Sequence, residues 1–258
     1  MSQTEEYKPT FINTVLLDEV KWSKEQFIRD FSEDWHWNTS LEESAETVNE
    51  ENMAIHVIDN LMLMVSFMEV PVPNGEAEKT ATMNWMWQDA ATVVKQHKAH
   101  ILVIVEGEGE ATDKALLLSK AVATLLKQEY STSVMAHGIV HPSAYYEACR
   151  DLLEEDELVS EFHVWIGLSK HEGKFGMYTY GLRLFGKEEM EIYYDPKDVH
   201  PKEIDDFLRN MAEYVIESDV TLKDGETAGV SETHFCKISL SEGIALDGNT
   251  LKIDYIAN

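Results

Sequence analysis

Cysteine is scarce in this sequence, and long apolar runs are absent from it. Among 258 residues only Cys149 and Cys236 are cysteines, and they lie too far apart in the chain to resemble a metal-ligand or redox pair. This usage is typical of a reducing cytoplasm. No apolar run approaches the roughly 20 residues of a membrane helix. The polar start MSQTEEYKPT also lacks the apolar core of a signal peptide, so we expect a soluble, cytoplasmic protein.

Cationic residues are also in short supply. The chain has 21 lysines and arginines against 48 aspartates and glutamates, which gives a formal net charge of -27. Such a charge repels nucleic acid and anionic membrane surfaces. It favours cationic proteins, neutral molecules or metal ions as partners, although acidic charge also serves solubility alone. We expect a cationic protein partner, and neither nucleic acid nor a membrane.

Motifs of nucleophilic and zinc-dependent enzymes are missing as well. The sequence has no G-x-S-x-G elbow and no H-E-x-x-H pair. Gly107 and Gly109 follow an apolar run, as in a dinucleotide fingerprint, but Thr112 stands where the third glycine would be. The acidic side chains within 106–110 surround this turn and would repel a phosphate. We expect an ordinary strand-to-helix loop here, and no cofactor.

Four histidines form a pattern that could hold a metal. His97 and His100 are three residues apart, while His137 and His141 flank the end of a short predicted strand. Three-residue spacing can place two imidazoles on one helix face, but a break into a strand is expected around 98–100. The helix dipole also favours a histidine in the last turn of a helix. A metal-dependent enzyme or small-molecule sensor using His97, His100 and His137 therefore stays open as an alternative.

Hydrophobic periodicity predicts an α+β protein. In the first half, the predicted strands are 11–20, 53–59, 61–70 and 99–106, and the predicted helices are 23–35, 80–98 and 111–129. The order β-α-β-β-α-β is that of a ferredoxin-like split βαβ unit, here with a helix added. In the second half, the predicted strands are 133–138, 162–170, 176–185 and 188–195, and the predicted helices are 141–156 and 200–218. We expect a ferredoxin-like half at 1–130 and a second α+β half with antiparallel strands at 131–258, as tandem domains or one continuous domain.

The most acidic stretch is 33–51, which has no lysine or arginine. It is predicted to be a solvated loop. Its glutamates are candidate contacts for a cationic partner, namely Glu42, Glu43, Glu46, Glu50 and Glu51.

Several motifs together are similar to those of one bacterial family. They are H-x-A-H-I-L-V at 97–103, M-E-V-P-V-P at 68–73, T-Y-G-L-R-L-F-G-K-E-E-M-E-I at 179–192, and A-E-Y-V-I followed by L-K-D-G-E-T-A-G near the C-terminus. The combination resembles the family catalogued as domain of unknown function 4261, over roughly residues 60–255. The resemblance implies no activity, and no catalytic residue is carried over from it. The most specific segment of the resemblance is T-x-G-L-x-x-F-G-x-x-E, and its glycines have structural explanations. Gly181 suits a bulge in a strand, and Gly186 suits a turn.

The same segment offers two further candidate contacts. Glu189 and Glu191 lie on one face of a predicted strand and could accept a cationic partner. Together these features predict a non-catalytic cytoplasmic binding protein that acts through an acidic surface. The concrete version is an immunity or antitoxin-like inhibitor of a basic effector, because opposed charges give such pairs fast and specific association. The sequence leaves the partner's identity and the oligomeric state open.

Overall fold

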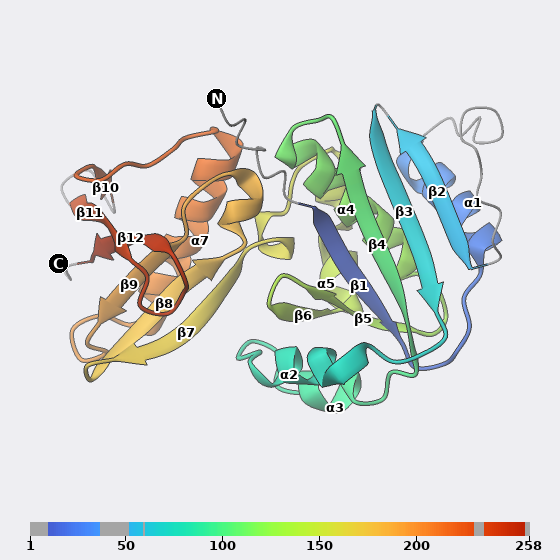
Figure 1. The fold of residues 1–258 in the computed structure, drawn as a ribbon, viewed down its shortest axis with the longest axis horizontal. Helices are drawn as coiled ribbons and strands as arrows, with labels where there is room; N and C mark the ends of the chain where they lie inside the picture. The colour runs from blue at the N-terminus through green and yellow to red at the C-terminus, as the bar shows by residue number, and fades with distance from the viewer. Residues whose placement is uncertain (1–9, 37–51, 59, 230–234, 256–258) are drawn as a thin grey trace, which may run out of the picture. The chain divides into compact units, whose positions relative to one another are not determined.

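The chain divides into two compact units, each built around one six-stranded sheet. The computed structural model describes residues 10–36, 52–58, 60–229 and 235–255 (Figure 1). Contacts divide the chain after Phe162, into an N-terminal unit at 1–162 and a C-terminal unit at 163–258. The α+β class is therefore confirmed, and the two sheets are separate.

The N-terminal unit alternates strands and helices. Its elements are β1 (Phe11–Leu17), α1 (Lys24–Trp35), β2 (Met53–Ile58), β3 (Leu61–Met68), the 3-10 turn η1 (Pro73–Gly75), α2 (Glu76–Thr82), α3 (Ala90–Val94), β4 (Ala99–Gly107), α4 (Ala111–Leu125), β5 (Ser131–Ala136), β6 (Ile139–Pro142), α5 (Ser143–Ala148), α6 (Arg150–Glu154) and the 3-10 turn η2 (Ser160–Phe162). The strand order is β2-β3-β4-β1-β5-β6, with every neighbouring pair antiparallel.

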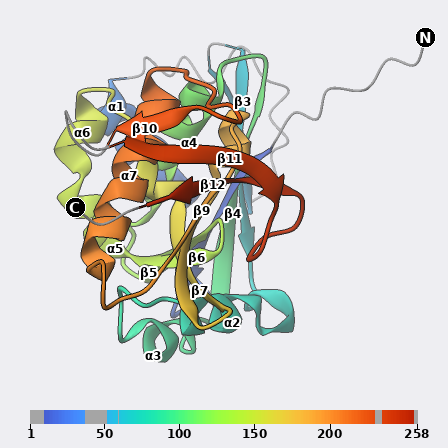
Figure 2. The same ribbon diagram turned by 90° about the vertical axis from the view of Figure 1, so that its left-hand side faces the viewer.

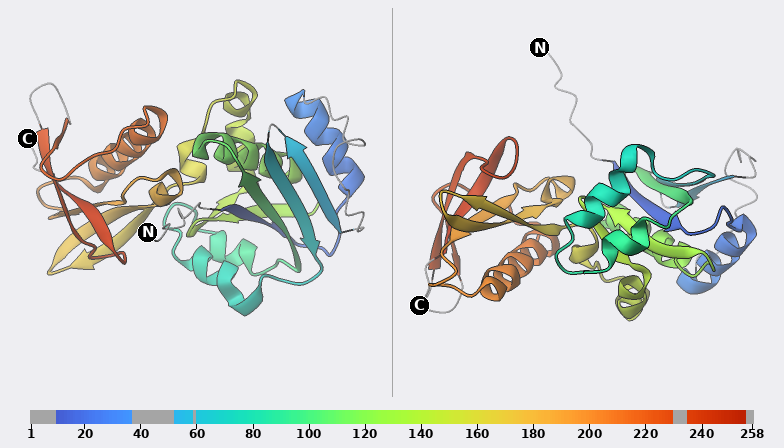
Figure 3. Two further views of the ribbon diagram at one scale, coloured as in Figure 1. Left: turned by 45° about the horizontal axis from the view of Figure 1, so that its top comes forward. Right: turned by 90° about the horizontal axis from the view of Figure 1, so that it is seen from below.

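One face of this sheet is fully buried at β4, and the other face is covered only in part. Ile101, Val103 and Val105 are fully buried on the face that α1 and α4 cover. The opposite face carries Leu16, which packs with buried residues of α2 and α3. Figure 3 shows these two helices, in teal, beside the sheet. Successive residues of a strand point to opposite faces, so the apolar run of β4 also places Leu102 and Ile104 on the second face, where they are half-buried.

Three expectations for the N-terminal half need correction. The helix predicted at 80–98 is two short helices, because the Asn84 side chain accepts hydrogen bonds from the backbone N–H groups of Met86 and Trp87 and ends the first one. The unit extends to 162 and not 130, because β5 and β6 join the first sheet. The ferredoxin-like arrangement expected for this half is not confirmed, because the sheet has six strands and β4 lies between β3 and β1.

The C-terminal unit has two three-stranded meanders separated by a helix. Its elements are β7 (Trp165–His171), β8 (Lys174–Tyr180), the 3-10 turn η3 (Leu182–Phe185), β9 (Met190–Tyr194), α7 (Pro201–Glu217), β10 (Thr227–Gly229), β11 (Phe235–Glu242) and β12 (Asn249–Asp254). The strand order is β10-β11-β12-β9-β8-β7. The pairs are antiparallel except for β12 and β9, which run parallel.

Helix α7 covers one face of this second sheet, as Figure 2 shows. Its buried side chains recur at helical spacing, with Ile204, Leu208 and Val215 among them. Pro201 opens the helix, where its missing N–H has no consequence for the helical hydrogen bonds. The helix predicted at 200–218 is thus confirmed. The strand predicted at 176–185 ends earlier, at Tyr180, and the turn η3 occupies Leu182–Phe185, so the prediction is wrong for this last part.

Acid should weaken the N-terminal unit because it holds histidines that are buried without their charge. Burial, together with the positive charge of Lys24, lowers the pKa of His56 to about 4, and burial lowers the pKa of His137 to about 4. The unfolded-state pKa of histidine is about 6.5, so the unfolded chain binds more protons between these two values. Stability should therefore fall as pH drops from about 6.5 to about 4, by roughly 1.4 kcal/mol per pH unit for each histidine.

The variant His56→Gln should lower this pH slope relative to the wild type. The measurement is urea unfolding at a series of pH values, followed by a signal from the N-terminal unit. Equal slopes for the variant and the wild type would contradict the assignment of His56 as a neutral, buried side chain.

Candidate functional site

The carboxylate of Glu189 organises the segment at 179–192, which carries the T-x-G-L-x-x-F-G-x-x-E motif. Its Oε2 accepts a hydrogen bond from Thr179 Oγ1 at 2.8 Å, and its Oε1 accepts from the backbone N–H groups of Gly181 at 2.9 Å and Arg183 at 3.3 Å. Thr179 Oγ1 in turn accepts from the N–H of Met190 at 2.8 Å. These bonds tie the end of β8 and the turn η3 to the start of β9.

Gly181 is required at this turn by backbone geometry. Its φ is +128°, and a Cβ added there would lie 2.0 Å from the backbone oxygen of His163. Only glycine adopts this conformation at low cost. The expected bulge in a continuous strand is thus a strand end, and the T-x-G-L-x-x-F-G-x-x-E pattern describes a turn closed by its own glutamate.

Glu191 has the same role toward a second loop. Its carboxylate accepts hydrogen bonds from the N–H groups of Ile244 and Ala245 at 3.1 Å, and Lys252 Nζ lies 3.2 Å from its Oε2. The connection between β11 and β12 is therefore held against the sheet. Backbone donors and one ammonium group satisfy this carboxylate inside the protein.

The expectation that Glu189 and Glu191 accept a cationic partner is not supported by their positions. They are 2% and 1% exposed, and the partners named above occupy their oxygens. Burial raises the pKa of Glu189, against the lowering effect of its hydrogen bonds from Gly181 and Thr179. Alternation along a strand indicates a shared face, but it does not reveal that a loop returns to cover that face.

Loss of the Glu189 carboxylate should destabilise the C-terminal unit. Glu189→Ala leaves the buried donors of Thr179 and Gly181 and the part-buried N–H of Arg183 without this acceptor, so the free energy of unfolding should fall by about 3 kcal/mol. Glu188→Gln is the matched control, because it removes the same charge from the exposed neighbouring residue and should change stability by less than about 0.5 kcal/mol. Denaturant unfolding measures both, and equal effects of the two substitutions would contradict the role of Glu189.

His97 and His100 both hold one loop in place. His97 Nε2 accepts a hydrogen bond from the N–H of Val72 at 2.9 Å, while its Nδ1 lies 2.6 Å from the oxygen of Val94. His100 Nδ1 lies 2.8 Å from the oxygen of Val70. Both ring nitrogens of His97 are therefore engaged, as a neutral imidazole allows. The two histidines therefore have a structural role, because they hold residues 70–72 in place.

The other two candidate histidines lie in the β5–β6 hairpin. The ring of His141 packs near Tyr145 and Phe162, while His137 has a buried Nε2 without a hydrogen-bond partner among the described residues. Within those residues no group of three or more His, Cys, Asp or Glu side chains could hold a metal ion. The glutamates at 42, 43, 46, 50 and 51 lie outside the described residues.

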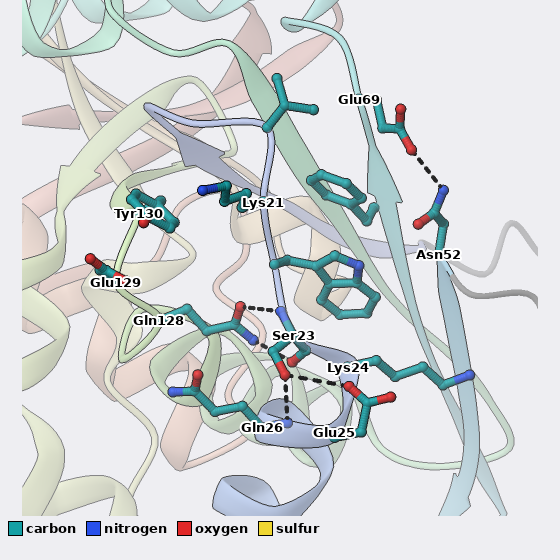
Figure 4. A pocket seen from close by; sticks show the side chains of 13 residues that line it. Lys21, Ser23, Lys24, Glu25, Gln26, Asn52, Glu69, Gln128, Glu129 and Tyr130 are labelled. Carbon is teal, nitrogen blue, oxygen red and sulfur yellow. Dashed lines mark hydrogen bonds between the residues drawn. The ribbon is translucent and has the colours of Figure 1, made fainter.

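One cleft in the N-terminal unit lies where α1 begins, and we call it the α1 cleft (Figure 4). Its volume is about 560 Å³, and it is lined by Val20, Lys21, Trp22, Ser23, Lys24, Glu25, Gln26, Asn52, Phe67, Glu69, Gln128, Glu129 and Tyr130. Gln128 bonds both the N–H and the C=O of Ser23 at 2.9 Å. Asn52 bonds Glu69 at 3.2 Å, and Trp22 stacks on Phe67. Several polar groups of the cleft are therefore paired with one another. The hydrogen bonds between Gln128 and Ser23 connect the start of α1 to the loop after α4.

A second cleft lies at the turn between β4 and α4, and we call it the carboxylate cleft. Its volume is about 320 Å³, and it is lined by Ile58, Leu61, Glu108, Gly109, Asp113, Leu116, Leu117, Lys120 and Asp156. Gly109 allows the turn to lie on the β2–β3 hairpin, since a Cβ there would be 2.9 Å from Leu61 Cδ2. The glycines of this turn thus serve close packing, while its glutamates are exposed. Sequence patterns do not reveal this combination of an apolar lining and carboxylates, because Asp156 is far in the chain from Glu108 and Asp113.

Comparison with family models finds a match to part of the chain. A family model described as "Domain of unknown function (DUF4261)" matches residues 178–254. The match confirms the family indicated by the T-x-G-L-x-x-F-G-x-x-E motif, within the C-terminal unit and over a shorter range than expected. No curated protein and no solved structure matches the chain. No helix within the described ranges is long and apolar enough to cross a membrane.

Proposed function

We propose that this protein is a non-catalytic binding protein that engages a cationic protein partner through exposed carboxylates of its N-terminal unit. The most concrete form of the proposal is an immunity or antitoxin-like inhibitor of a basic effector in the bacterial cytoplasm. The free cysteines Cys149 and Cys236 fit a reducing compartment.

One observation carries this proposal, namely that two acidic segments meet at the carboxylate cleft. Residues 106–113 hold four acidic side chains and residues 151–157 hold five, and neither segment contains a lysine or arginine. All nine acidic residues are exposed. Glu108 and Asp113 from the first segment and Asp156 from the second line the same cleft.

The charge of this surface is only partly neutralised within the protein. Arg150 pairs with Glu154, and Lys120 pairs with Asp156. Among the described residues, no cation lies within ion-pair distance of the other acidic side chains of the two segments, Glu106, Glu108, Glu110, Asp113, Asp151, Glu155 and Glu157. The dipole of α4 favours Asp113 in its first turn, which is the local reason for that residue. The remaining charge attracts a cationic surface and repels an anionic one.

Affinity capture in rising salt tests the proposal. The protein should retain a basic partner from a lysate of its own cells, and the complex should weaken as salt shortens the range of electrostatic attraction. Once this partner has been purified, its affinity for the quadruple variant Glu108→Gln, Asp113→Asn, Glu155→Gln, Glu157→Gln should be about tenfold or more below its affinity for the wild type.

The matched control removes four exposed carboxylates from the C-terminal unit, by Glu188→Gln, Asp198→Asn, Glu203→Gln and Glu217→Gln. It has the same net charge as the test variant and should bind within about twofold of the wild type. A complex that ignores salt, or that the two variants weaken equally, would contradict the proposal.

A further inference from the structure

The carboxylate cleft combines two kinds of surface. Leu61 and Leu117 are buried in its lining, and the half-buried Ile58 and Leu116 extend this apolar surface. Glu108 and Asp113 contribute exposed carboxylates from the turn before α4 and from its first turn. A ligand that fits both surfaces needs an apolar stem and a cationic end, because apolar area attracts methylene groups and carboxylates attract charge.

The lining of the cleft already includes one side chain of this kind, Lys120. Lys120 comes from α4, and its side chain is only 6% exposed. Its ammonium group pairs with Asp156 and lies 5.1 Å from the centre of the Trp35 ring. A buried stem with a cationic end is therefore stable at this point of the fold. Because Lys120 pairs with Asp156, it leaves Glu108 and Asp113 without an ion-pair partner among the described residues.

We infer that the carboxylate cleft is the binding pocket for one arginine or lysine side chain of the cationic partner. The methylene stem lies on the leucines, and the cationic group bonds to Glu108 and Asp113. This inference rests on the proposed function, because it names the group by which that partner is recognised. A bare metal ion would gain nothing from the apolar lining, and an anion would be repelled by the carboxylates.

The size of the cleft agrees with a single side chain. Its volume of about 320 Å³ is at the small end of ligand pockets, which begin at about 300 Å³. A single basic side chain buried in a pocket, with other charges around it, is the usual form of an interface anchor. The neighbouring exposed carboxylates, such as Glu155 and Glu157, would then steer the partner without entering the pocket.

The test uses a small probe, so that it does not depend on the partner. Nα-acetyl-argininamide is titrated into the full chain at physiological salt, and amide NMR shifts are followed. The structure predicts saturable shifts at Gly109, Asp113 and Leu117. The citrulline analogue has the same shape without the charge, and it should bind at least about tenfold more weakly.

Three variants distinguish binding in the cleft from attraction by the overall negative charge of the protein. Glu108→Gln with Asp113→Asn should weaken the probe by about tenfold or more. Glu155→Gln with Glu157→Gln removes the same charge beside the pocket and should stay within about twofold of the wild type. Leu116→Trp leaves the charge unchanged but fills the cleft, and it should also abolish the saturable shifts.

Two results would overturn the inference. The first is a set of shifts that spread over the acidic surface and do not saturate, or that both charge variants weaken equally. The second is saturable binding that Leu116→Trp leaves unchanged. Either result leaves salt-sensitive capture of the partner intact, so failure of the pocket is distinguishable from failure of the proposed function.

Discussion

The placement of carboxylates is the constraint on which this structure depends. The chain has 48 acidic residues and 21 basic ones, so most carboxylates cannot find a cation within the protein. A buried carboxylate without partners is costly. The C-terminal unit meets this constraint with backbone N–H groups, as the bonds of Glu189 to Gly181 and of Glu191 to Ile244 show. Two loops are held in place as a result.

In the N-terminal unit, the carboxylates of residues 106–113 and 151–157 lie in solvent. Exposed acidic side chains from two distant segments meet around an apolar cleft, where only one nearby lysine, Lys120, forms an ion pair with a cleft carboxylate among the described residues. Carboxylates of the same chemistry therefore differ in role according to their burial. In the segment matched by the family model, buried glutamates hold the fold. In the N-terminal unit, most of the exposed acidic side chains of the two segments have no ion-pair partner among the described residues.

Sequence patterns predict the regular elements well. The apolar run of β4 and the amphipathic repeat of α7 are both found where periodicity places them, because burial leaves a direct trace in the sequence. The same patterns fail at Glu189 and Glu191, which are buried by turns that return to the sheet. They also miss the carboxylate cleft, since Asp113 and Asp156 come together only through tertiary packing. The roles of His97 and His100 in holding the loop at 70–72 are hidden for the same reason.

Hydrogen exchange of the protein with and without its captured partner tests the central claim most directly. The account predicts slower exchange of backbone amides in 106–117 and 151–157, the segments that form the acidic surface and its cleft. Exchange in the α1 cleft, at 20–26 and 128–130, should stay unchanged. Protection of the α1 cleft or the C-terminal unit, with no change at the acidic segments, would contradict the account.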